Sequence, residues 1–398
     1  MPLSLYDLWN WAVRETTPLL VYQMTVSVFV VFSLINAIAD GFAFRRPSSG
    51  PALSPGPLPS LSVLIPARNE EAVIADCVRS LLDAGYPGPL EILVLDDRSE
   101  DRTGEIVAAL AAGDSRVRLL RGGELLPGWK GKPNALRQLA EAATGDLLLL
   151  TDADCRFYPG SLEASVRHRE RTGADCLSLM PYLICESFWE HIVIPLQYFL
   201  VFTTLPIRNV YASPNPAFAA ANGAFILLPA DTYGRLGGHG AVRGEMAEDI
   251  KFAQHVKKSG MRLVYADGSH TYAVRMYESL SGIWEGFSKN MFPAMGRSLA
   301  VLSVWLLFQV TTQILPSLWV VLALFNGDRS PAGFVLPLFH LFVGLSIRLA
   351  LSVRFRQAVW ATLTHPVGWC IVCAIAVRSA YLSLSGKGHT WKGRIYTS

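Results

Sequence analysis

The chain is poor in charged residues and carries little excess of either sign. Asp, Glu, Lys and Arg make up 17% of its 398 residues, whereas about 25% is usual for a soluble protein. The formal net charge of +3 is too small to indicate a nucleic-acid partner. Hydrophobic residues reach 51%, and the mean hydropathy is +0.31. This composition predicts one large domain together with membrane segments.

The sequence also lacks a disulfide framework. Its six cysteines are scattered along the chain, whereas small secreted domains pair theirs densely. The single C-x-x-C, from Cys370 to Cys373, lies in an apolar run with no second pair near it. These two cysteines are therefore interpreted as small residues of a membrane helix.

The first apolar run, 18–40, indicates a membrane anchor. A spanning helix needs about 20 apolar residues, and a signal peptide would follow a positive segment. Residues 1–17 contain Asp7 and Glu15 and are not positive, so we expect the run to stay uncleaved. Arg45 and Arg46 follow it, and the positive-inside rule then places the rest of the catalytic region in the cytoplasm.

The C-terminal region 299–384 contains three further apolar runs, and their topology stays open. Three spans would leave the tail, 385–398, outside the cell. Yet this tail carries Lys387, Lys392 and Arg394, which favour the inside. Either all three runs span the membrane, or one of them is re-entrant or interfacial.

Between these regions, and after a Pro/Gly/Ser-rich linker over 41–57, a domain is expected at 58–290. Buried-strand patterns alternate with helical patterns, which predicts an α/β fold: a Rossmann-like, mostly parallel sheet with helices on both faces. The strands are expected at 61–66, 91–97, 146–154, 221–229 and 261–267, and the helices at 70–84, 101–112, 133–143 and 248–259. The apolar segment 187–206 is either a core helix or a helix in the membrane interface beside an acceptor site.

Polar residues gather where the predicted strands end, the edge at which open α/β sheets bind ligands. They are Pro66, Arg68 and Glu70 after the first strand, Asp96 and Asp97 after the second, and Asp152, Ala153 and Asp154 after the third.

This arrangement suits transfer of a sugar from a nucleotide. Asp97 or Asp96 could accept hydrogen bonds from a ribose or base. Asp152 and Asp154 are hard-oxygen ligands for Mg²⁺ or Mn²⁺, which would stabilise a leaving diphosphate. Asp249 is the candidate general base. Its neighbour Glu248 either contacts substrate or stabilises the start of a helix.

Two glycine-rich loops complete the candidate site. The first contains Trp129 and Lys132, whose ammonium is expected to meet the nucleotide or its phosphates. The second contains Gly238 and His239. Gly238 permits unusual backbone angles close to a ligand. His239 either contacts phosphate or acceptor or is a solvated loop residue.

With these motifs, the chain over 58–290 resembles glycosyltransferase family 2, which has the GT-A fold. The matching elements are IPARNEE, VLDDRSEDRT, TDADC, LGGHGAVRGEMAEDI and KKSGMRLVYADG. The layout is similar to the ceramide glucosyltransferase branch, which includes hopanoid-associated and carotenoid glucosyltransferases. Its GW-x-GK motif precedes the D-x-D, and its terminal W-K-G-R-x-Y is matched here with Trp391 and Arg394.

The resemblance implies residue roles and an inverting reaction without a covalent intermediate. Glu70 and Asp97 would hold the nucleoside, Asp152 would approach nucleotide and metal, Asp154 would ligate the metal, and Asp249 would be the base. The Gln/Arg-x-x-Arg-Trp string of many members is absent. Lys289 or Arg297 could supply positive charge in its place.

The sequence therefore predicts an integral membrane enzyme that moves a hexose, glucose from UDP-glucose, onto a lipid. The acceptor is expected to be sphingolipid-, hopanoid- or carotenoid-like. Transfer to polyprenyl phosphate or a polysaccharide is an alternative, and a non-catalytic nucleotide-binding scaffold is a third.

Overall fold

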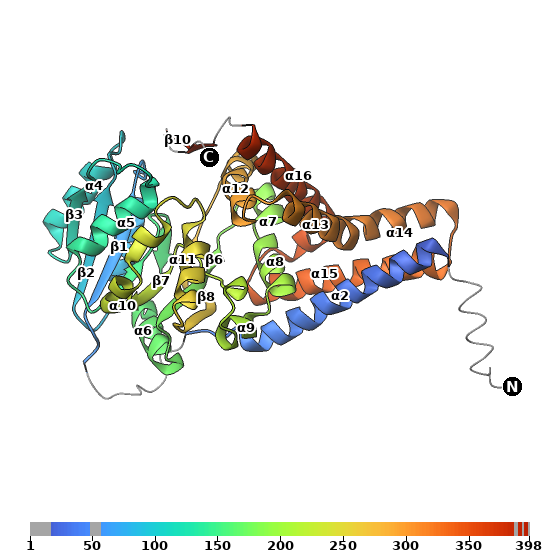
Figure 1. Cartoon of the computed structure of the whole chain (residues 1–398), viewed down its shortest axis with the longest axis horizontal. Helices are drawn as coiled ribbons and strands as arrows, with labels where there is room; N and C mark the ends of the chain where they lie inside the picture. The colour runs from blue at the N-terminus through green and yellow to red at the C-terminus, as the bar shows by residue number, and fades with distance from the viewer. Residues whose placement is uncertain (1–16, 48–56, 386–388, 392–393, 397–398) are drawn as a thin grey trace. The chain divides into compact units, whose positions relative to one another are not determined.

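The computed structural model describes residues 17–47, 57–385, 389–391 and 394–396 (Figure 1). The predicted segment 1–17, except its last residue, and much of the linker and tail lie outside the described residues. The chain divides into two compact units. We call them the sheet unit, which comprises Asp40–Ser187, Pro206–Arg297 and Ser379–Ser398, and the helical unit, which comprises Met1–Ala39, Phe188–Leu205 and Ser298–Arg378.

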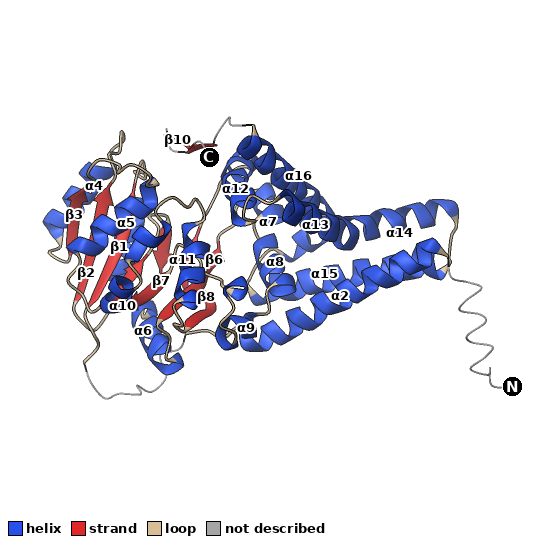
Figure 2. Cartoon of the chain, in the orientation of Figure 1, coloured by secondary structure: helices blue, strands red, loops and turns tan. Residues whose placement is uncertain are grey.

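In the described part of the sheet unit, eight strands form one mixed sheet with helices packed on it (Figure 2). Their order is β3-β2-β1-β4-β7-β6-β8-β5. Pairing is parallel except where β7 meets β4 and β6 and where β5 meets β8. The strands are β1 Leu61–Ala67, β2 Leu90–Asp96, β3 Val117–Arg121, β4 Leu147–Leu150, β5 Cys155–Phe157, β6 Cys176–Leu183, β7 Ile226–Pro229 and β8 Leu263–Val274.

The central strands form because their branched aliphatic residues can be buried on both faces. In β1 and β2, for example, the consecutive residues Val63 and Leu64, and Ile92 and Leu93, are fully buried, and consecutive residues of a strand face opposite sides of the sheet. Strand β1 pairs in parallel with both β2 and β4, so these three strands end at the same edge of the sheet. That edge therefore carries the polar residues that the sequence places after each strand.

The helices of the sheet unit follow the alternating pattern that the sequence predicts. They are α3 Ile74–Asp83, α4 Thr103–Gly113, α5 Gly131–Ala142, α6 Ser161–Thr172, α9 Ile207–Ala212, α10 Ala230–Arg235, α11 Glu248–Lys258 and α12 Leu280–Ala294, with short 3-10 turns η1 Pro216–Phe218 and η2 Gly238–Val242. Two short strands at the tail, β9 His389–Trp391 and β10 Arg394–Tyr396, pair antiparallel.

Three predicted strands are wrong in extent. The strand expected over 261–267 is longer, since β8 continues to Val274, and the other two are shorter. The strand expected over 146–154 ends at Leu150, because Thr151 donates its hydroxyl to the carbonyl of Ala224 (2.8 Å) and the chain turns before re-entering the sheet as β5. The strand expected over 221–229 is reduced to Ile226–Pro229. Both shortened ends became loops at the edge where the acidic residues gather.

The helical unit contains the long apolar helices. Among the described residues, four helices are long and apolar enough to cross a membrane: Pro18–Ala43, Leu299–Asn326, Pro331–Arg354 and Val359–Leu384. Their parts are α2 Pro18–Ala43, α13 Leu299–Gln309, η3 Val310–Ile314, α14 Leu315–Asn326, η4 Pro331–Val335, α15 Leu336–Arg354, η5 Val359–Thr364 and α16 His365–Leu384. The four expected apolar segments are thus helical.

The apolar segment 187–206 forms two short helices, α7 Phe188–Val193 and α8 Leu196–Thr204. Residues 188–205 belong to the helical unit. Tyr198 stacks on Phe355, with ring centroids 3.9 Å apart, and Phe199 packs against His365 and Trp369. The segment is therefore packed among the apolar helices and is not a core helix of the sheet unit.

Candidate active site

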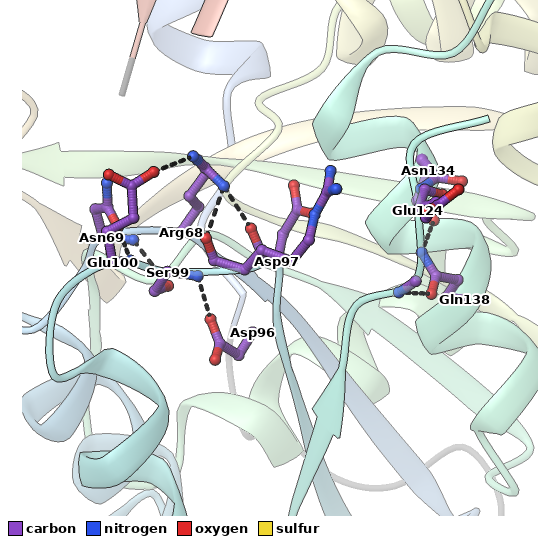
Figure 3. Close-up of polar contacts among 11 residues, drawn as sticks. Arg68, Asn69, Asp96, Asp97, Ser99, Glu100, Glu124, Asn134 and Gln138 are labelled. Atoms are coloured by element: carbon purple, nitrogen blue, oxygen red, sulfur yellow. Dashed lines mark hydrogen bonds and ion pairs between the residues drawn. The ribbon is translucent and has the colours of Figure 1, made fainter. Parts of the chain in front are cut away.

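The loops that follow β1 and β2 are tied to each other by hydrogen bonds (Figure 3). The Arg68 guanidinium donates to the carbonyls of Asp97 and Arg98, both at 2.8 Å, and pairs with Glu100 at 3.0 Å. Asn69 donates its backbone N–H to Ser99 and accepts from the N–H of Glu100. Arg68 thus fixes the Asp97 loop, and its predicted contact with the nucleotide stays a prediction.

Asn69 and Arg98 both have positive φ angles, 53° and 58°, although neither is glycine. Such backbone is disfavoured for side chains and persists only where the surroundings enforce it. Both strained residues lie in the loops just described, at the carboxyl ends of β1 and β2. The strain therefore coincides with the edge of the sheet where a ligand is expected.

The two neighbouring aspartates after β2 differ in their surroundings. Asp96 is buried, forms a short ion pair with Arg121 and accepts the N–H of Ser99 at 2.9 Å (Figure 3). Its carboxylate oxygens are thus both engaged within the protein. Asp97 is paired with Arg98 at 3.8 Å, and its side chain is 12% exposed, against 4% for that of Asp96. Of the two, Asp97 is consequently the better candidate for holding a nucleoside.

The D-x-D lies in the turn between β4 and β5. Ala153 is 2% exposed, whereas Asp152 and Asp154 are both partly exposed. Because the small central residue points into the core, the two aspartates are presented on the outer side of the turn. Below them lie the thiols of Cys77 and Cys155, and burial raises the pKa of both, with a further contribution from the charge of Asp154.

Lys132, on the first turn of α5, links two of the acidic clusters. Its ammonium lies 2.6 Å from Asp152 and 3.0 Å from Glu248. Burial lowers the pKa of this lysine, but the carboxylates of Asp152, Glu248 and Asp249 outweigh burial and raise it well above its usual value. Lys132 therefore stays a cation between the D-x-D and the start of α11.

Asp249, whose charge also acts on this lysine, is held by two backbone hydrogen bonds. It accepts the N–H of Gly223 at 3.1 Å and that of Ile250 at 2.8 Å. A side chain at position 223 would place its Cβ 3.0 Å from the Lys132 ammonium nitrogen. Glycine at this position thus allows the base candidate, the cation and the loop before β7 to approach closely.

Desolvation by burial and, after it, the charge of Glu248 raise the pKa of Asp249 to about 6, although Lys132 and the two N–H donors act to lower it. A carboxylate of this basicity can take a proton near neutral pH more readily than an ordinary aspartate.

We expect kcat/KM to rise with pH, passing half of its plateau near pH 6, because Asp249 accepts a proton only when ionised. Initial rates between pH 5 and 8 test this. Lys132→Met should move the midpoint to higher pH, since the ammonium lowers the pKa of Asp249. A rate that is independent of pH over this range would contradict the assignment.

The loop before α5 is anchored to that helix (Figure 3). Gln138 accepts the N–H of Gly123 at 2.9 Å, and Asn134 donates to the carbonyl of Glu124. The guanidinium of Arg137 lies 5.6 Å from the ring centre of Trp129. Residues 128–130 also meet the other glycine-rich loop, since the N–H of Lys130 donates to the carbonyl of Arg243 at 2.7 Å.

The structure places His239 inside the protein. It is 1% exposed, hydrogen-bonds to the Tyr233 hydroxyl at 2.9 Å and stacks on Phe252. Desolvation, together with the charge of Lys132, lowers its pKa to about 3, so it is neutral. The expectation of a solvated loop histidine is wrong. Gly238 has φ +53°, and a Cβ there would overlap the Tyr233 ring, so glycine is required for this packing.

The remaining predicted contacts lie on other elements. Arg297, which follows α12, lies close enough for its charge to add to desolvation in lowering the pKa of Lys130. Lys289 is on α12. Trp391 and Arg394 are paired with each other across β9 and β10. Arg297 is therefore near the Trp129–Lys132 loop, whereas contacts of the other three with a substrate stay predictions.

The sequence interpretation missed two residues of this region, Gly223 and Tyr277. Gly223 follows Asn222, and this Asn-Gly dipeptide is a turn signal that could have identified it. Tyr277 lies three residues beyond β8. Strand β8 pairs antiparallel with β5, with Val274 opposite Cys155, so the chain after Val274 runs back along the D-x-D that precedes Cys155. Its ring covers Gly286 of α12, and burial, then the charge of Asp154, raises its pKa. No local signal marks Tyr277.

The residues present fit a divalent cation bound together with a diphosphate. Among the described residues, no group of three His, Cys, Asp or Glu side chains is arranged to hold a metal by itself. Mg²⁺ is usually held by one or two carboxylates, with substrate phosphates and water completing the shell. Asp152 and Asp154 supply two hard-oxygen ligands on one turn, which matches that type of site.

Comparison with known proteins gives a family match over part of the chain. Residues 62–214 match the model of the glycosyl transferase family 2. The matched region includes the loops after β1 and β2, the Trp129–Lys132 loop and the D-x-D.

Two curated relatives are similar to parts of the chain. The chain is 33% identical to the beta-monoglucosyldiacylglycerol synthase of Trichormus variabilis over 168 residues, which are 41% of this chain and 36% of that protein. It is 26% identical to the 4,4'-diaponeurosporenoate glycosyltransferase of Staphylococcus haemolyticus over 242 residues, 60% of this chain and 62% of that protein. The chain thus spans only about a third of the first relative and less than two thirds of the second.

The fold is shared with a solved glycosyltransferase structure. The mannosyltransferase PcManGT from Pyrobaculum calidifontis, in complex with GDP-Man and Mn²⁺, superposes with a TM-score of 0.55 over 92% of this chain and 99% of that one, at 16% identity. The expected GT-A fold is confirmed by this likeness. In the part of the chain that the structure describes, four apolar helices that are long enough to cross a membrane accompany this fold.

Proposed function

We propose that the chain is an inverting hexosyltransferase that moves glucose from UDP-glucose onto a membrane lipid. The observation that carries this proposal is the position of Asp249. This carboxylate has a pKa near 6 and lies beside Lys132, whose ammonium is itself 2.6 Å from the D-x-D. Such a group can take the proton of an acceptor while a neighbouring cationic site receives the leaving diphosphate.

The nucleoside would be held by Asp97 and Glu70. Asp97 follows β2 in a loop fixed by Arg68, and Glu70 follows β1 in the loop tied to it, so both belong to one preorganised edge. The Trp129–Lys132 loop would close over the diphosphate, with positive charge from Lys132 and Arg297.

Asp154 and Asp152 would hold Mg²⁺ or Mn²⁺, which when bound supplies positive charge that stabilises the departing diphosphate. The complex of the similarly folded mannosyltransferase contains Mn²⁺ and a nucleotide sugar. In this chain the Asp152 carboxylate would contact both the Lys132 ammonium and the metal ion. Lys132 would therefore also hold that carboxylate in place before the donor binds.

A lipid acceptor is supported by the relatives and by the helical unit. One relative is named for a glucosyldiacylglycerol and the other for a carotenoid acid. The sheet unit is joined to long apolar helices at both of its sequence ends, which would keep the active site at a bilayer surface. Arg45 and Arg46 follow the first of these helices, and the positive-inside rule places the sheet unit in the cytoplasm.

The test is to incubate membranes containing the expressed chain with radiolabelled UDP-glucose and to extract the lipids. We expect a labelled glycolipid that is absent from membranes of the Asp249→Asn variant. Stability of the product to mild acid indicates a glycoside or ester, whereas lability indicates a polyprenyl phosphate sugar. Absence of UDP release with any lipid extract would contradict transferase activity altogether.

A further inference from the structure

The residues that follow the apolar part of α2 carry exposed positive charge. Helix α2 is a candidate membrane span, and Asp40, in its last turn, is its first charged residue. At about 1.5 Å per residue, 18–39 extend about 33 Å, close to the ~30 Å of a hydrocarbon core. With α2 across the bilayer, the residues from Asp40 onward therefore begin at the level of the lipid headgroups.

We propose that Arg45, Arg46 and Arg208 form a binding site for the phosphate of an anionic phospholipid headgroup. We call these three residues the arginine cluster. All three belong to the sheet unit. The inference rests on α2 spanning the membrane, and it depends neither on the transfer activity of the chain nor on which sugar the chain transfers.

Arg208 is brought to the end of α2 by its neighbour Ile207. The backbone N–H of Ile207 donates to the Asp40 carboxylate at 3.0 Å, across 167 positions of the sequence. Arg208 is the next residue of α9, and its side chain is exposed, whereas Ile207 is fully buried. This contact therefore occupies one oxygen of the Asp40 carboxylate and leaves Arg208 on the surface.

The chain after α2 is fastened to β8. The carbonyl of Arg45 accepts the backbone N–H of Asp267 at 2.9 Å, and Phe44, which is 2% exposed, packs on Tyr265 with ring centroids 5.5 Å apart. The Arg46 guanidinium pairs with Asp267 at 3.3 Å, yet its side chain is 44% exposed. The backbone of this segment is thus anchored, whereas both arginine side chains are exposed.

Tyr211, on α9, links the two parts of the arginine cluster. Its hydroxyl donates to the carbonyl of Tyr265, the residue on which Phe44 packs. Burial and, after it, the charge of Asp40 raise the pKa of this hydroxyl, whereas the charge of Arg45 acts to lower it. Arg45 therefore lies near the short helix that carries Arg208.

The positive charge of the arginine cluster is only partly balanced. In the part of the chain that the structure describes, neither Arg45 nor Arg208 forms an ion pair. The two acidic residues that contact this region, Asp40 and Asp267, are 1% and 0% exposed, and Asp267 is already paired with Arg46. The surface therefore presents cations, whereas the carboxylates lie beneath it.

A buried lysine adds to this positive charge. Lys257 is 4% exposed, and its ammonium donates to the carbonyls of Asn209 and Val210, at 3.2 and 2.9 Å. These two residues directly follow Arg208 on α9. The ammonium is held by neutral carbonyl groups, so it strengthens the attraction of this region for an anion.

An exposed aromatic residue favours a lipid over a soluble anion. Phe42 is 82% exposed and lies three residues before Arg45. At a membrane interface an aromatic ring can contact acyl chains while basic side chains contact phosphates. A free phosphate ion would use the arginines but would leave this ring in water. The combination of Phe42 with the arginine cluster therefore fits a phospholipid.

Lipid titration of the purified full-length chain in neutral detergent tests the proposal. Phosphatidylglycerol and phosphatidylcholine with the same acyl chains are added, and bound lipids are counted by native mass spectrometry. We expect the chain to bind phosphatidylglycerol more tightly. Arg45→Gln/Arg208→Gln should weaken this binding about 25-fold, about fivefold for each arginine, and leave phosphatidylcholine binding unchanged. Equal affinity of the native chain for both lipids overturns the proposal.

Arg235→Gln is the matched control. Arg235 lies on α10 of the same unit, is 60% exposed and has its charge balanced by Asp231 at 3.6 Å. This variant should bind phosphatidylglycerol as the native chain does. An equal loss of binding in this control, or unchanged binding in the double variant, overturns the proposal.

Two further measurements decide the matter if the double variant does not fold. The single variants Arg45→Gln and Arg208→Gln should each weaken phosphatidylglycerol binding about fivefold. In the native chain, the preference for this lipid should decrease as salt is raised, because exposed charges are screened. Normal binding by both single variants, or a preference that salt does not change, overturns the proposal. Displacement of the lipid by inorganic phosphate also overturns it, since the site would then bind a free anion.

Discussion

Replacing Asp249 by asparagine should lower kcat by about 10²–10⁴-fold, the contribution typical of a general base. The amide keeps an acceptor oxygen for the N–H of Gly223 or Ile250, but it cannot take a proton from the acceptor. Binding of the donor should change little, because the nucleoside is expected to bind at the other side of the site. Turnover and UDP affinity measured on the same preparation separate the two effects.

Asp231→Asn is the matched control for this substitution. Its side chain is 73% exposed on α10 of the same unit and forms a long ion pair with Arg235, 3.6 Å apart. It also accepts the N–H of Thr232 at 2.6 Å, a hydrogen bond that the asparagine oxygen can keep. The control should keep full activity, and both variants should unfold at temperatures close to that of the unmodified chain. An Asp249→Asn enzyme that turns over at the normal rate would remove Asp249 from the role of base.

Replacing Asp154 by alanine should reduce turnover by at least about 10²-fold, the scale of losing one preorganised electrostatic stabiliser. The expected cause is loss of a ligand to Mg²⁺ or Mn²⁺, so binding of Mn²⁺ in the presence of UDP should weaken in parallel. Calorimetry or the paramagnetic signal of free Mn²⁺ measures this directly. An excess of chelator should abolish activity of the unmodified enzyme, and Mn²⁺ or Mg²⁺ should restore it.

Asp76→Ala provides a comparison for this second variant. Asp76 lies on α3 and forms an ion pair with Arg156, the residue after Cys155, at 3.0 Å on an exposed surface. Exposed pairs of this kind contribute little, so its removal should leave metal binding and turnover near normal. Undiminished activity of Asp154→Ala, or of the native enzyme in chelator, would exclude metal-assisted departure of the diphosphate.

Much of the sheet could be predicted because its signals are local. The runs that became β1 and β2 are short, rich in branched aliphatics and bounded by polar residues, and both strands appear where expected. Strands β3, β5 and β6 were missed. Strand β5, for instance, has only three residues, and it exists because β8 offers it an antiparallel partner, which no local pattern records.

Some residues of the candidate site could likewise be predicted from local patterns, whereas the roles of others depend on tertiary contacts. Its acidic residues were found from their order along the chain, since parallel strands must end at one edge. Which of Asp96 and Asp97 faces a ligand could not be decided, because the answer depends on Arg121, a residue of the next strand along the sheet. The sequence likewise allowed His239 to be a solvated loop residue, whereas the structure shows it buried against Tyr233 and Phe252.

The sequence by itself determined the class of fold, the acidic clusters and the apolar helices, because each depends on residue types at short, regular spacing. Only the tertiary structure decided that Lys132 joins the D-x-D to α11 and that Gly223 holds Asp249. These facts depend on contacts between residues that are far apart in the sequence, such as Lys132 and Glu248. Such contacts form only after the chain has folded, so their geometry cannot be read from local spacing.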